Sequence, residues 1–540
     1  MASRAVLPVV SAAEIASVRA ANQRAATRKS NRRLIVGVVR PQAVLPEAST
    51  MNWVAVEGGY AARAAVTSPE AGSLRLGINL MGVPGDVEMV FFGSDDERLE
   101  GPVKVSQVPD RFAPWWSPLT EGATQTVEFF VPAGHDPRAT GLAITGASHL
   151  FTTLSSRLTK RLSDIGKSEA CEIDVICSPL NSGAQFKQAA ASTAQMVFND
   201  GGFTGLCSGT LLADSDTLTQ KPWLYSANHC FDNDATPYKT AAQKQAVANT
   251  LSTLWMFQSN SCSGGVGSNF PEATWSQVSG GSFLAYADLF NDVLLVRLNN
   301  SPPASAFFSG WDANPVSSGT ALTTIHHPQG DLKKVSLGTS LGFAVPAVGD
   351  GNSSFIQVRW NSGTTEPGSS GGGIWSLTGG QYFLRGGLWG GSGSCSNAMG
   401  IDYFSRFDQV YPAIASYIGP VAGPTADYTD LWWNPNESGW GLNLTQHPSN
   451  IIFGVWYTYE ADGTRTWFVM PSGTWSASNI YSGPLYATTG PSYAGTFTAS
   501  SVQARQVGSG TLTFTSTGAG TFAYVVDGVS GTKLIQRQPY

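Results

Sequence analysis

Three separated segments between residues 168 and 420 carry side chains that could perform nucleophilic chemistry together. His229 ends an apolar run in a turn of small residues, Asp292 directly precedes a strand-like run, and Ser370 lies in a glycine-rich turn. A serine hydroxyl needs a base within hydrogen-bond reach, and that base needs a group that holds its tautomer. We expect Ser370, His229 and Asp292 to supply these roles, with the amides of Gly368 and Ser370 binding the developing oxyanion.

Chain order decides between two kinds of hydrolase. Gly368, Ser370 and Gly372 satisfy the G-x-S-x-G motif of α/β-hydrolases, whose triad runs Ser, acid, His along the chain. Here the order is His, Asp, Ser, and the glycine-rich region offers few helices, so an esterase is disfavoured. The pair His326-His327 could suggest a metal site, but no further ligands stand at zinc spacing. We therefore expect no metal and no cofactor, and a loop at His326-His327 that packs against the fold.

Composition excludes several classes of protein. The 540 residues allow about three to five domains. Hydrophobic residues reach 42% and charged residues only 13%, which excludes a disordered chain. The 60 glycines and 58 aromatic residues (16 Trp, 16 Tyr and 26 Phe) favour short strands joined by tight turns. A net charge of −6 argues against a nucleic-acid partner. No apolar run approaches the roughly 18 residues of a membrane span.

The chain divides into four regions. Residues 1–40 form a basic leader or arm, and residues 41–167 a β-rich region without cysteine. Residues 168–420 contain all six cysteines, and a Pro/Gly linker then leads to a β module rich in Trp and Tyr over residues 426–540. An even number of cysteines in one region predicts disulfides and therefore an oxidising, extracellular location. Because residues 1–10 make a poor signal peptide, we expect an export signal that was removed or lies outside this sequence.

Several strings in the cysteine-containing region match a known family in the same order along the chain. They are Cys171-Glu-Ile-Asp-Val-Ile-Cys177, Ser226-Ala-Asn-His-Cys230, Phe308-Ser-Gly-Trp-Asp312, His326-His-Pro-Gln-Gly330, Thr365-Glu-Pro-Gly-Ser-Ser-Gly371 and Cys395-Ser. On these strings, residues 168–420 resemble the trypsin/chymotrypsin-like serine endopeptidases, and within them the bacterial lysyl endopeptidases.

The resemblance implies two antiparallel β-barrels with the active site between them, preceded by a β-rich prodomain. It implies protein or peptide substrates, with His229 as general base, Asp292 as its orienting group and Ser370 as the nucleophile that forms an acyl-enzyme. Six cysteines alone leave many pairings open. The resemblance implies the bridges Cys171–Cys395, Cys177–Cys262 and Cys207–Cys230.

The resemblance also bears on specificity. Trypsin-like enzymes select basic side chains with a carboxylate six residues before the nucleophile, and here that position is Thr364. Lysyl endopeptidases carry an acid shortly after the last cysteine, and Asp402 falls there. A desolvated Asp402 would favour a cation, so we expect cleavage after Lys. The family usually has His before its double glycine. Here Trp389 precedes Gly390, and its ring could wall the pocket by packing on a lysine stem.

Activation is predicted from the boundary at residue 168. Lys167 directly precedes Ser168, where the family's mature chain begins, so the enzyme could cut its own Lys167–Ser168 bond. Trypsin's new amino terminus pairs with an Asp beside the nucleophile, but here that neighbour is Ser369. We therefore expect latency to come from residues 1–167, which would cover the cleft as an intramolecular inhibitor.

The aromatic tail leaves a second function open. Trp432, Trp433 and Trp440 could form an exposed platform for carbohydrate or another polymer, although such side chains more often fill a small β core. Two classes of function follow. One is a secreted endopeptidase with a removable prodomain, and the other a non-catalytic protease-fold scaffold whose aromatic tail binds a carbohydrate or surface polymer.

Overall fold

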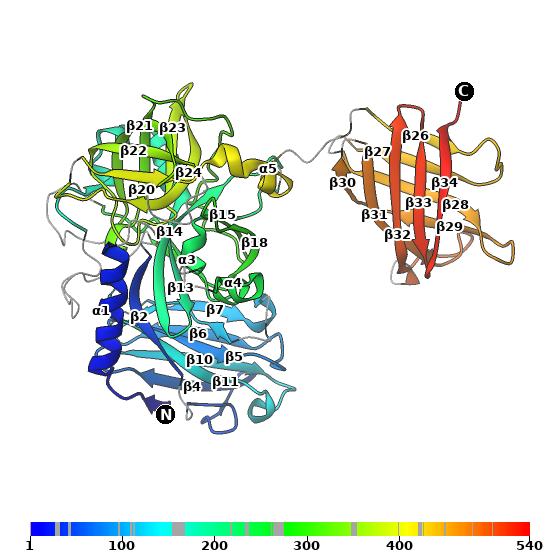
Figure 1. Cartoon of the computed structure of the whole chain (residues 1–540). Coiled ribbons are helices and arrows are strands. Elements are labelled where there is room, and N and C mark those ends of the chain that lie inside the picture. Colours follow the sequence, from blue (N-terminus) through cyan, green and yellow to red (C-terminus); the bar gives the residue numbers. More distant parts are fainter. Residues whose placement is uncertain are drawn as a thin grey trace. The chain divides into compact units, whose positions relative to one another are not determined.

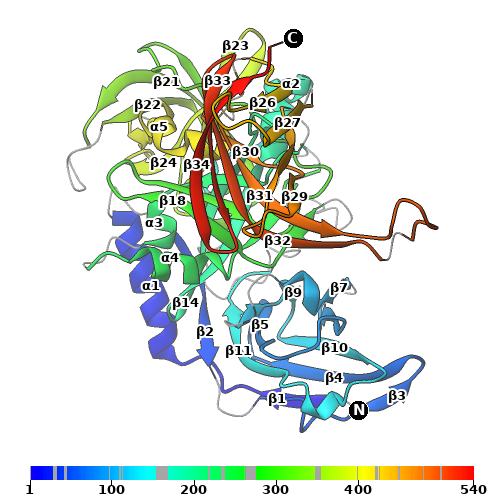
Figure 2. The same cartoon turned by 90° about the vertical axis from the view of Figure 1, so that its right-hand side faces the viewer.

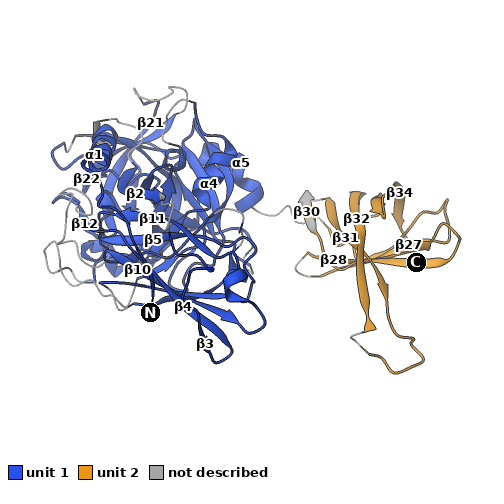
Figure 3. Cartoon of the chain, turned by 90° about the horizontal axis from the view of Figure 1, so that it is seen from below, with its two compact units in different colours: residues 1–418 blue, residues 419–540 orange. Residues whose placement is uncertain are grey.

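Short strands follow one another through most of the chain, as the glycine and aromatic content predicts. The computed structural model describes residues 2–539 apart from 28–32, 42–44, 96–97, 109–110, 112–113, 154–167, 217–218, 233–236, 261, 263–274, 347–353, 398, 420–423, 425, 448–449, 478 and 499–500. The chain forms two compact units, residues 1–418 and 419–540 (Figure 3). Within the described ranges, no helix has the length and apolar character needed to cross a membrane.

Two sheets build the N-terminal region (Figure 1). One contains β1 (Ser3–Val6), β3 (Val54–Val56), β4 (Gly59–Thr67), β6 (Glu88–Gly93), β7 (Glu100–Lys104) and β10 (Thr124–Pro132). The other contains β2 (Leu34–Pro41), β5 (Ser73–Asn79), β8 (Trp115–Trp116), β9 (Thr120–Glu121) and β11 (Ala143–Leu150). Alternate residues of β10 are buried, including Val127 and Phe129, and they contribute to one core with Leu76 of β5. This period of two is typical of a sheet with one buried face.

The first forty residues do not form a separate arm. β1 pairs in parallel with β4, and helix α1 (Ala12–Thr27) lies beside β2 (Figures 1 and 2). β2 pairs with β11 on one side and with β14 of the next region on the other. The apolar run that forms β2, Leu34-Ile-Val-Gly-Val-Val, explains why this segment is taken into a sheet despite its basic flanks.

The protease region begins with the first barrel. It contains helices α2 (Ala184–Ser192), α3 (Asn228–Phe231) and α4 (Ala241–Ala248), and strands β13 (Thr193–Asp200), β14 (Phe203–Leu212), β15 (Trp223–Ser226), β16 (Ser252–Trp255), β17 (Ser276–Val278), β18 (Ser282–Asp288) and β19 (Val293–Leu298). Neighbouring strands follow the order β17-β16-β13-β14-β15-β19-β18. Strand β14 continues this sheet into the N-terminal region through β2.

The second barrel closes on itself. Its strands are β20 (Ala321–His326), β21 (Lys334–Ala344), β22 (Phe355–Ser362), β23 (Gly373–Thr378), β24 (Gln381–Gly391) and β25 (Ile401–Phe404), and the pairing of β21 with β22 completes the ring. β12 (Ile173–Asp174) adds to β21, and helix α5 (Phe407–Ile418) ends the unit. These two barrels confirm the mostly β, trypsin-like fold that the sequence predicts.

Residues 419–540 form a β-barrel of their own. Its strands are β26 (Asp430–Trp433), β27 (Gly441–Gln446), β28 (Ile452–Tyr459), β29 (Arg465–Met470), β30 (Thr474–Ala477), β31 (Ile480–Thr489), β32 (Gln503–Ser516), β33 (Ala519–Val526) and β34 (Val529–Arg537), closed by a β29–β31 pairing. Trp432 is buried in the core, where Tyr428 stacks on Phe514. Trp440 packs partly buried against the same core. Trp432 is therefore a core residue and not part of an exposed platform.

Candidate active site

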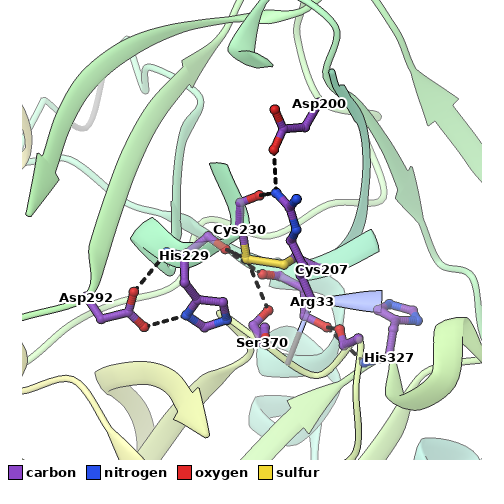
Figure 4. The surroundings of a disulfide bond; sticks show 11 residues. Arg33, Asp200, Cys207, His229, Cys230, Asp292, His327 and Ser370 are labelled. Carbon is purple, nitrogen blue, oxygen red and sulfur yellow. Dashed lines mark hydrogen bonds and ion pairs between the residues drawn. A yellow bond between two sulfur atoms is a disulfide. The ribbon is translucent and has the colours of Figure 1, made fainter. Parts of the chain in front are cut away.

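His229 and Asp292 meet on the first barrel. His229 lies in α3, immediately after β15, and Asp292 lies in the turn between β18 and β19. The Asp292 carboxylate accepts two hydrogen bonds from His229, one from the ring Nδ1–H (2.7 Å) and one from the backbone amide (2.9 Å) (Figure 4). A carboxylate can only accept, so this contact places the proton on Nδ1. Asp292 has a φ of 50°, a conformation that is uncommon outside glycine, as is often found at functional sites.

Ser370 comes from the second barrel, in the loop between β22 and β23. Figure 4 shows the His229 ring between the Asp292 carboxylate and Ser370. The Ser370 hydroxyl is buried and forms no hydrogen bond within the described part of the chain. The Ser370 carbonyl accepts a hydrogen bond of 2.8 Å from the amide of Ser208, which belongs to β14 of the first barrel. This bond holds the Ser370 loop against the barrel that carries His229 and Asp292.

Two glycines beside Ser370 are required by close contacts. Gly368 and Gly371 have positive φ angles of 93° and 74°. A Cβ on Gly371 would lie 2.0 Å from Ser226 Oγ, and one on Gly368 would lie 2.9 Å from the His327 carbonyl oxygen. Only glycine fits both the conformation and the space at these positions. Among the described residues, the amides of Gly368 and Ser370 donate to no backbone carbonyl, so they are available to an incoming oxygen.

Three disulfides brace the protease region. They are Cys171–Cys395, Cys177–Cys262 and Cys207–Cys230, the pairing that the resemblance implies. Cys207–Cys230 joins β14 to α3, directly beside His229 (Figure 4). The bridge therefore ties the strand that supports Ser370 to the helix that presents the histidine.

Asp402 lies fully buried on β25 and is held by three neutral donors. Its Oδ2 accepts from Trp360 Nε1 (2.7 Å) and Thr365 Oγ1 (2.6 Å), and its Oδ1 accepts from the Gly393 amide (2.9 Å). A Cβ on Gly391 would come within 2.2 Å of Asp402 Oδ1. The sequence did not indicate Trp360 or Thr365 as partners of this carboxylate. Because all three donors are uncharged, they do not neutralise the negative charge of the Asp402 carboxylate.

Trp389 and Gly390 lie at the end of β24, which pairs with β25. The Gly390 and Tyr403 positions are partners across the two strands, as are Gly391 and Asp402. The Trp389 ring is buried, with its centroid 5.5 Å from that of Phe355 and 5.9 Å from that of Tyr403. These two residues therefore lie on the strand next to the one that carries Asp402.

The start of the expected mature chain is bound inside the fold. Lys167 lies outside the described residues, whereas Ser168 is buried. Its amide and hydroxyl both donate to Asp331 Oδ2, at 3.1 and 2.7 Å, and Lys334 Nζ lies 3.8 Å from the same oxygen. The residue beside the nucleophile, Ser369, is not the partner. Asp331 was missed from sequence, although it directly follows the His326–Gly330 string that carried part of the resemblance.

A buried polar network lies beneath the loop that carries Ser370. His326 Nδ1 and Ser369 Oγ share a hydrogen bond of 2.7 Å, and Ser369 Oγ also accepts from the Glu366 amide. Glu366 Oε1 accepts from the Glu169 amide (2.9 Å). Burial, and then the proximity of Glu366, raise the pKa of Glu172 well above its usual value. The network links the segment after residue 168 to the loop that carries Ser370.

His326 and His327 are buried, and their ring nitrogens form hydrogen bonds with neighbouring protein groups. Burial lowers the pKa of His326 to about 3, with a further contribution from Lys334. His327 Nδ1 donates to the Asp331 carbonyl (3.0 Å), and burial lowers its pKa well below the usual value. Both rings are therefore neutral. His326 ends β20 and supports the Ser370 loop through its hydrogen bond to Ser369, so the loop expected for this segment begins only at His327.

Comparison with known proteins identifies the family. Residues 6–151 match the lysyl endopeptidase N-terminal domain, and residues 165–405 match the lysyl endopeptidase C-terminal domain. A lysyl endopeptidase from Pseudomonas aeruginosa is 34% identical over 386 residues, which are 69% of this chain and 78% of that protein. The chain belongs to the lysyl endopeptidase family. It is a serine endopeptidase, as the sequence predicts.

Solved structures of a Mycobacterium tuberculosis protease are also similar. The active form of Rv3671c protease is 14% identical and covers 45% of this chain and 87% of its own, with a TM-score of 0.29. The inactive form is 13% identical and covers 45% of this chain and 96% of its own, with a TM-score of 0.28.

The buried neutral His326 predicts an acid-sensitive fold. Because the unfolded chain takes up a proton near pH 6.5 and the folded chain only near pH 3, stability falls as the pH drops between these values, by about 1.4 kcal/mol per unit at most. Urea unfolding of a Ser370→Ala protein at about pH 7 and about pH 5 measures this loss. A His326→Asn substitution in that background should reduce it, whereas His135→Asn at a partly exposed histidine should not. Parallel losses in all three proteins would contradict the assignment.

Proposed function

We propose that this endopeptidase cleaves peptide bonds after lysine through an acyl-enzyme formed on Ser370. The observation that carries the acyl-enzyme mechanism is the pair of hydrogen bonds that His229 donates to the buried Asp292. The Asp292 carboxylate lies on one side of the His229 ring and Ser370 on the other (Figure 4). Ser370 Oγ attacks the peptide carbonyl, and the hydroxyl proton of Ser370 passes to His229 Nε2. Asp292 stabilises the His229 imidazolium that results. His229 then protonates the leaving amine, and water hydrolyses the acyl-enzyme by the same steps.

The oxyanion of each tetrahedral intermediate binds the amides of Gly368 and Ser370. Their N–H groups make no backbone hydrogen bond within the described ranges, so they need not break one to bind the substrate oxygen. Donors that are fixed before the reaction contribute about 10²–10³ in rate each. The positive φ of Gly368, and the His327 carbonyl that leaves no room for a Cβ there, explain why glycine occupies this turn.

Lysine specificity is assigned to Asp402, with Trp389 and Gly390 beside it. A fully buried carboxylate whose donors are all neutral is stabilised by an incoming cation, because burial without a counter-charge is costly. Glycine at position 391 lets the neighbouring strand pass close to the carboxylate, because any Cβ there would come within 2.2 Å of Asp402 Oδ1. The Trp389 ring packs at a tilt against Phe355 and edge-on against Tyr403, and this fixed position supports a wall for the aliphatic stem of lysine.

We assign activation to self-cleavage between Lys167 and Ser168, with residues 1–167 as an inhibitory prodomain. The support is the position of Ser168, which is already bound to Asp331 in the uncut chain. After cleavage, the new ammonium group of Ser168 would replace a neutral amide as donor to this carboxylate. The three disulfides favour a secreted enzyme, since such bonds persist in oxidising compartments.

A polymer-binding role for the C-terminal unit is supported by a surface other than the one that the sequence indicated. Phe453, Tyr457 and Tyr459 of β28 and Trp467 of β29 are each about half exposed, and Tyr457 and Trp467 are direct cross-strand partners. Exposed aromatic rings on one face of a sheet can stack on sugar rings. This role adds to peptide hydrolysis, because family membership sets aside a purely non-catalytic scaffold.

Substitution of the nucleophile should stop maturation. We expect the unmutated protein to shorten to a chain that begins at Ser168, and Ser370→Ala to remain at 540 residues. Intact-mass spectrometry and amino-terminal sequencing measure both. A fluorophosphonate probe should label the unmutated protein and an exposed-serine control, Ser530→Ala, but not Ser370→Ala. Shortening of Ser370→Ala to the same start would show that another protease performs the cut.

Neutralising Asp402 should remove lysine preference. Asp402→Asn keeps the side-chain volume but loses the charge, so kcat/KM for peptides with lysine before the cut should fall by about 10²-fold or more. Peptides with a neutral side chain at that position serve as the control and should lose much less. Equal losses for both kinds of peptide would assign Asp402 a purely structural role.

Removal of the exposed tryptophan tests the polymer-binding surface. Ser370→Ala protein carrying Trp467→Ala should bind an insoluble polysaccharide such as cellulose, chitin or peptidoglycan about tenfold more weakly than its parent in a pull-down titration. Tyr493→Ala, which removes a fully exposed ring elsewhere in the same unit, is the matched control. Equal binding by all three proteins would argue against this surface.

A further inference from the structure

Strand β14 has two edges, and the edge next to Ser370 is shared by β2, the loop that carries Ser370, and β15. β13 pairs along one edge of this strand, from Phe203 to Thr210. On the other edge, β2 of the N-terminal region pairs with Phe203–Leu206 and β15 pairs with Thr210–Leu212. Between them, the Ser208 amide bonds the Ser370 carbonyl. The strand from the N-terminal region therefore ends where the nucleophile loop begins.

The N-terminal end of β2 is the end that lies nearest to Ser370. The strand is antiparallel to β14, with Val38 opposite Phe203 and Leu34 opposite Leu206. Arg33, the residue before Leu34, is consequently the nearest described part of this strand to Ser208 and Ser370. A substrate whose scissile bond lies at Ser370, and whose leaving part runs in this direction along β14, would need the same backbone groups as β2.

Arg33 anchors the end of the strand beside the catalytic residues. Its side chain is buried, and Nη1 donates to Asp200 Oδ2 (2.6 Å) and to the Cys230 carbonyl (3.2 Å). Cys230 directly follows His229, and Figure 4 shows Arg33 along the Cys207–Cys230 disulfide. A buried ion pair with a second hydrogen bond is a strong local attachment once it is formed.

Helix α1 and a shared core hold β2 in place. Asn22 of α1 donates to the Ile35 carbonyl and accepts from the Ile35 amide, both at 2.8 Å. Leu34 and Val36 are buried in one cluster with Leu206, Phe257 and Leu332 of the protease region. Because these contacts are independent of the bond at residue 167, cleavage there leaves them intact.

We propose that β2, anchored by Arg33, is the inhibitory element of the N-terminal region, and that it blocks the side of the active site where the leaving part of a substrate lies. The block persists after the Lys167–Ser168 bond is cut, until the N-terminal segment dissociates. This inference rests on the proposed function of Ser370. It assigns inhibition to one strand and one arginine instead of to the prodomain as a whole.

The test uses protein cut before Ser168 and compares two substrates with lysine before the scissile bond. One is an anilide with no residue on the leaving side, and the other is a peptide that extends several residues beyond the cut. We expect gel filtration to show the N-terminal segment still bound. Relative to enzyme freed of the segment, hydrolysis of the peptide should be inhibited far more than hydrolysis of the anilide. Arg33→Ala should weaken retention of the segment and relieve inhibition of the peptide by about thirty-fold.

Two further variants complete the design. Arg63→Ala removes an arginine of the same region that is ion-paired to Glu128 on the exposed surface, and it should change neither retention nor inhibition. Asn22→Ala loosens β2 without touching the protease region and should act in the same direction as Arg33→Ala, which covers the case in which Arg33→Ala fails to fold.

Either of two results would overturn the inference. One is equal inhibition of peptide and anilide, and the other is unchanged retention and inhibition in both the Arg33 and Asn22 variants. Failure of the proposed function itself would look different. In that case, a fluorophosphonate would leave Ser370 unlabelled even after the N-terminal segment had been removed completely.

Discussion

The hydrogen bond from the Ser208 amide to the Ser370 carbonyl is the contact on which the arrangement of the site depends. The serine belongs to one barrel, and His229 and Asp292 belong to the other. The distance between Ser370 and His229 therefore depends on how closely the two barrels pack. Gly371 permits this distance, because any side chain there would collide with Ser226. The Cys207–Cys230 bridge then keeps the supporting strand and the histidine together.

The nucleophile loop is supported from below by groups that are costly to bury. His326 and the Glu366 amide bond the Ser369 hydroxyl, and Glu172 lies 3.9 Å from the His326 ring. Burial shifts the pKa of Glu366, Glu172 and His326 in the direction that favours the neutral form of each. Such groups stabilise a unique conformation only when they are mutually satisfied. Since Glu169 contributes an amide to this network, the conformation of the first residues after position 167 is coupled to the loop that carries Ser370.

The N-terminal region takes part in the same sheet and core as the first barrel. Leu34 and Val36 pack with Phe257 and Leu332, and β2 extends the sheet that contains β13 and β14. A segment that completes the core of its neighbour stabilises that neighbour while it is bound, and a strand on the active-site edge restricts access at the same time. If β2 is the inhibitory element that we propose, one set of contacts serves both the core of the first barrel and its latency.

Much of the protein could be predicted from the sequence because the signals are local. Period-two burial and the glycine-rich turn at Ser370 are properties of short segments. The order of the motif strings along the chain indicated the two barrels and the family. The boundary between the two compact units followed from the Pro/Gly linker. The segment 1–40 was harder to interpret, because its basic composition concealed the apolar run of β2.

Other features were decided only by the tertiary structure. Ser168 meets Asp331 across 163 positions and Arg33 meets Asp200 across 167, and neither pair leaves a pattern in the chain. Asp402 was recognised by its place after the last cysteine, but its donors Trp360 and Thr365 were not. The physical reason is that a local motif specifies a turn or a strand, whereas the partner of a buried charge depends on strand register and on which surfaces exclude water.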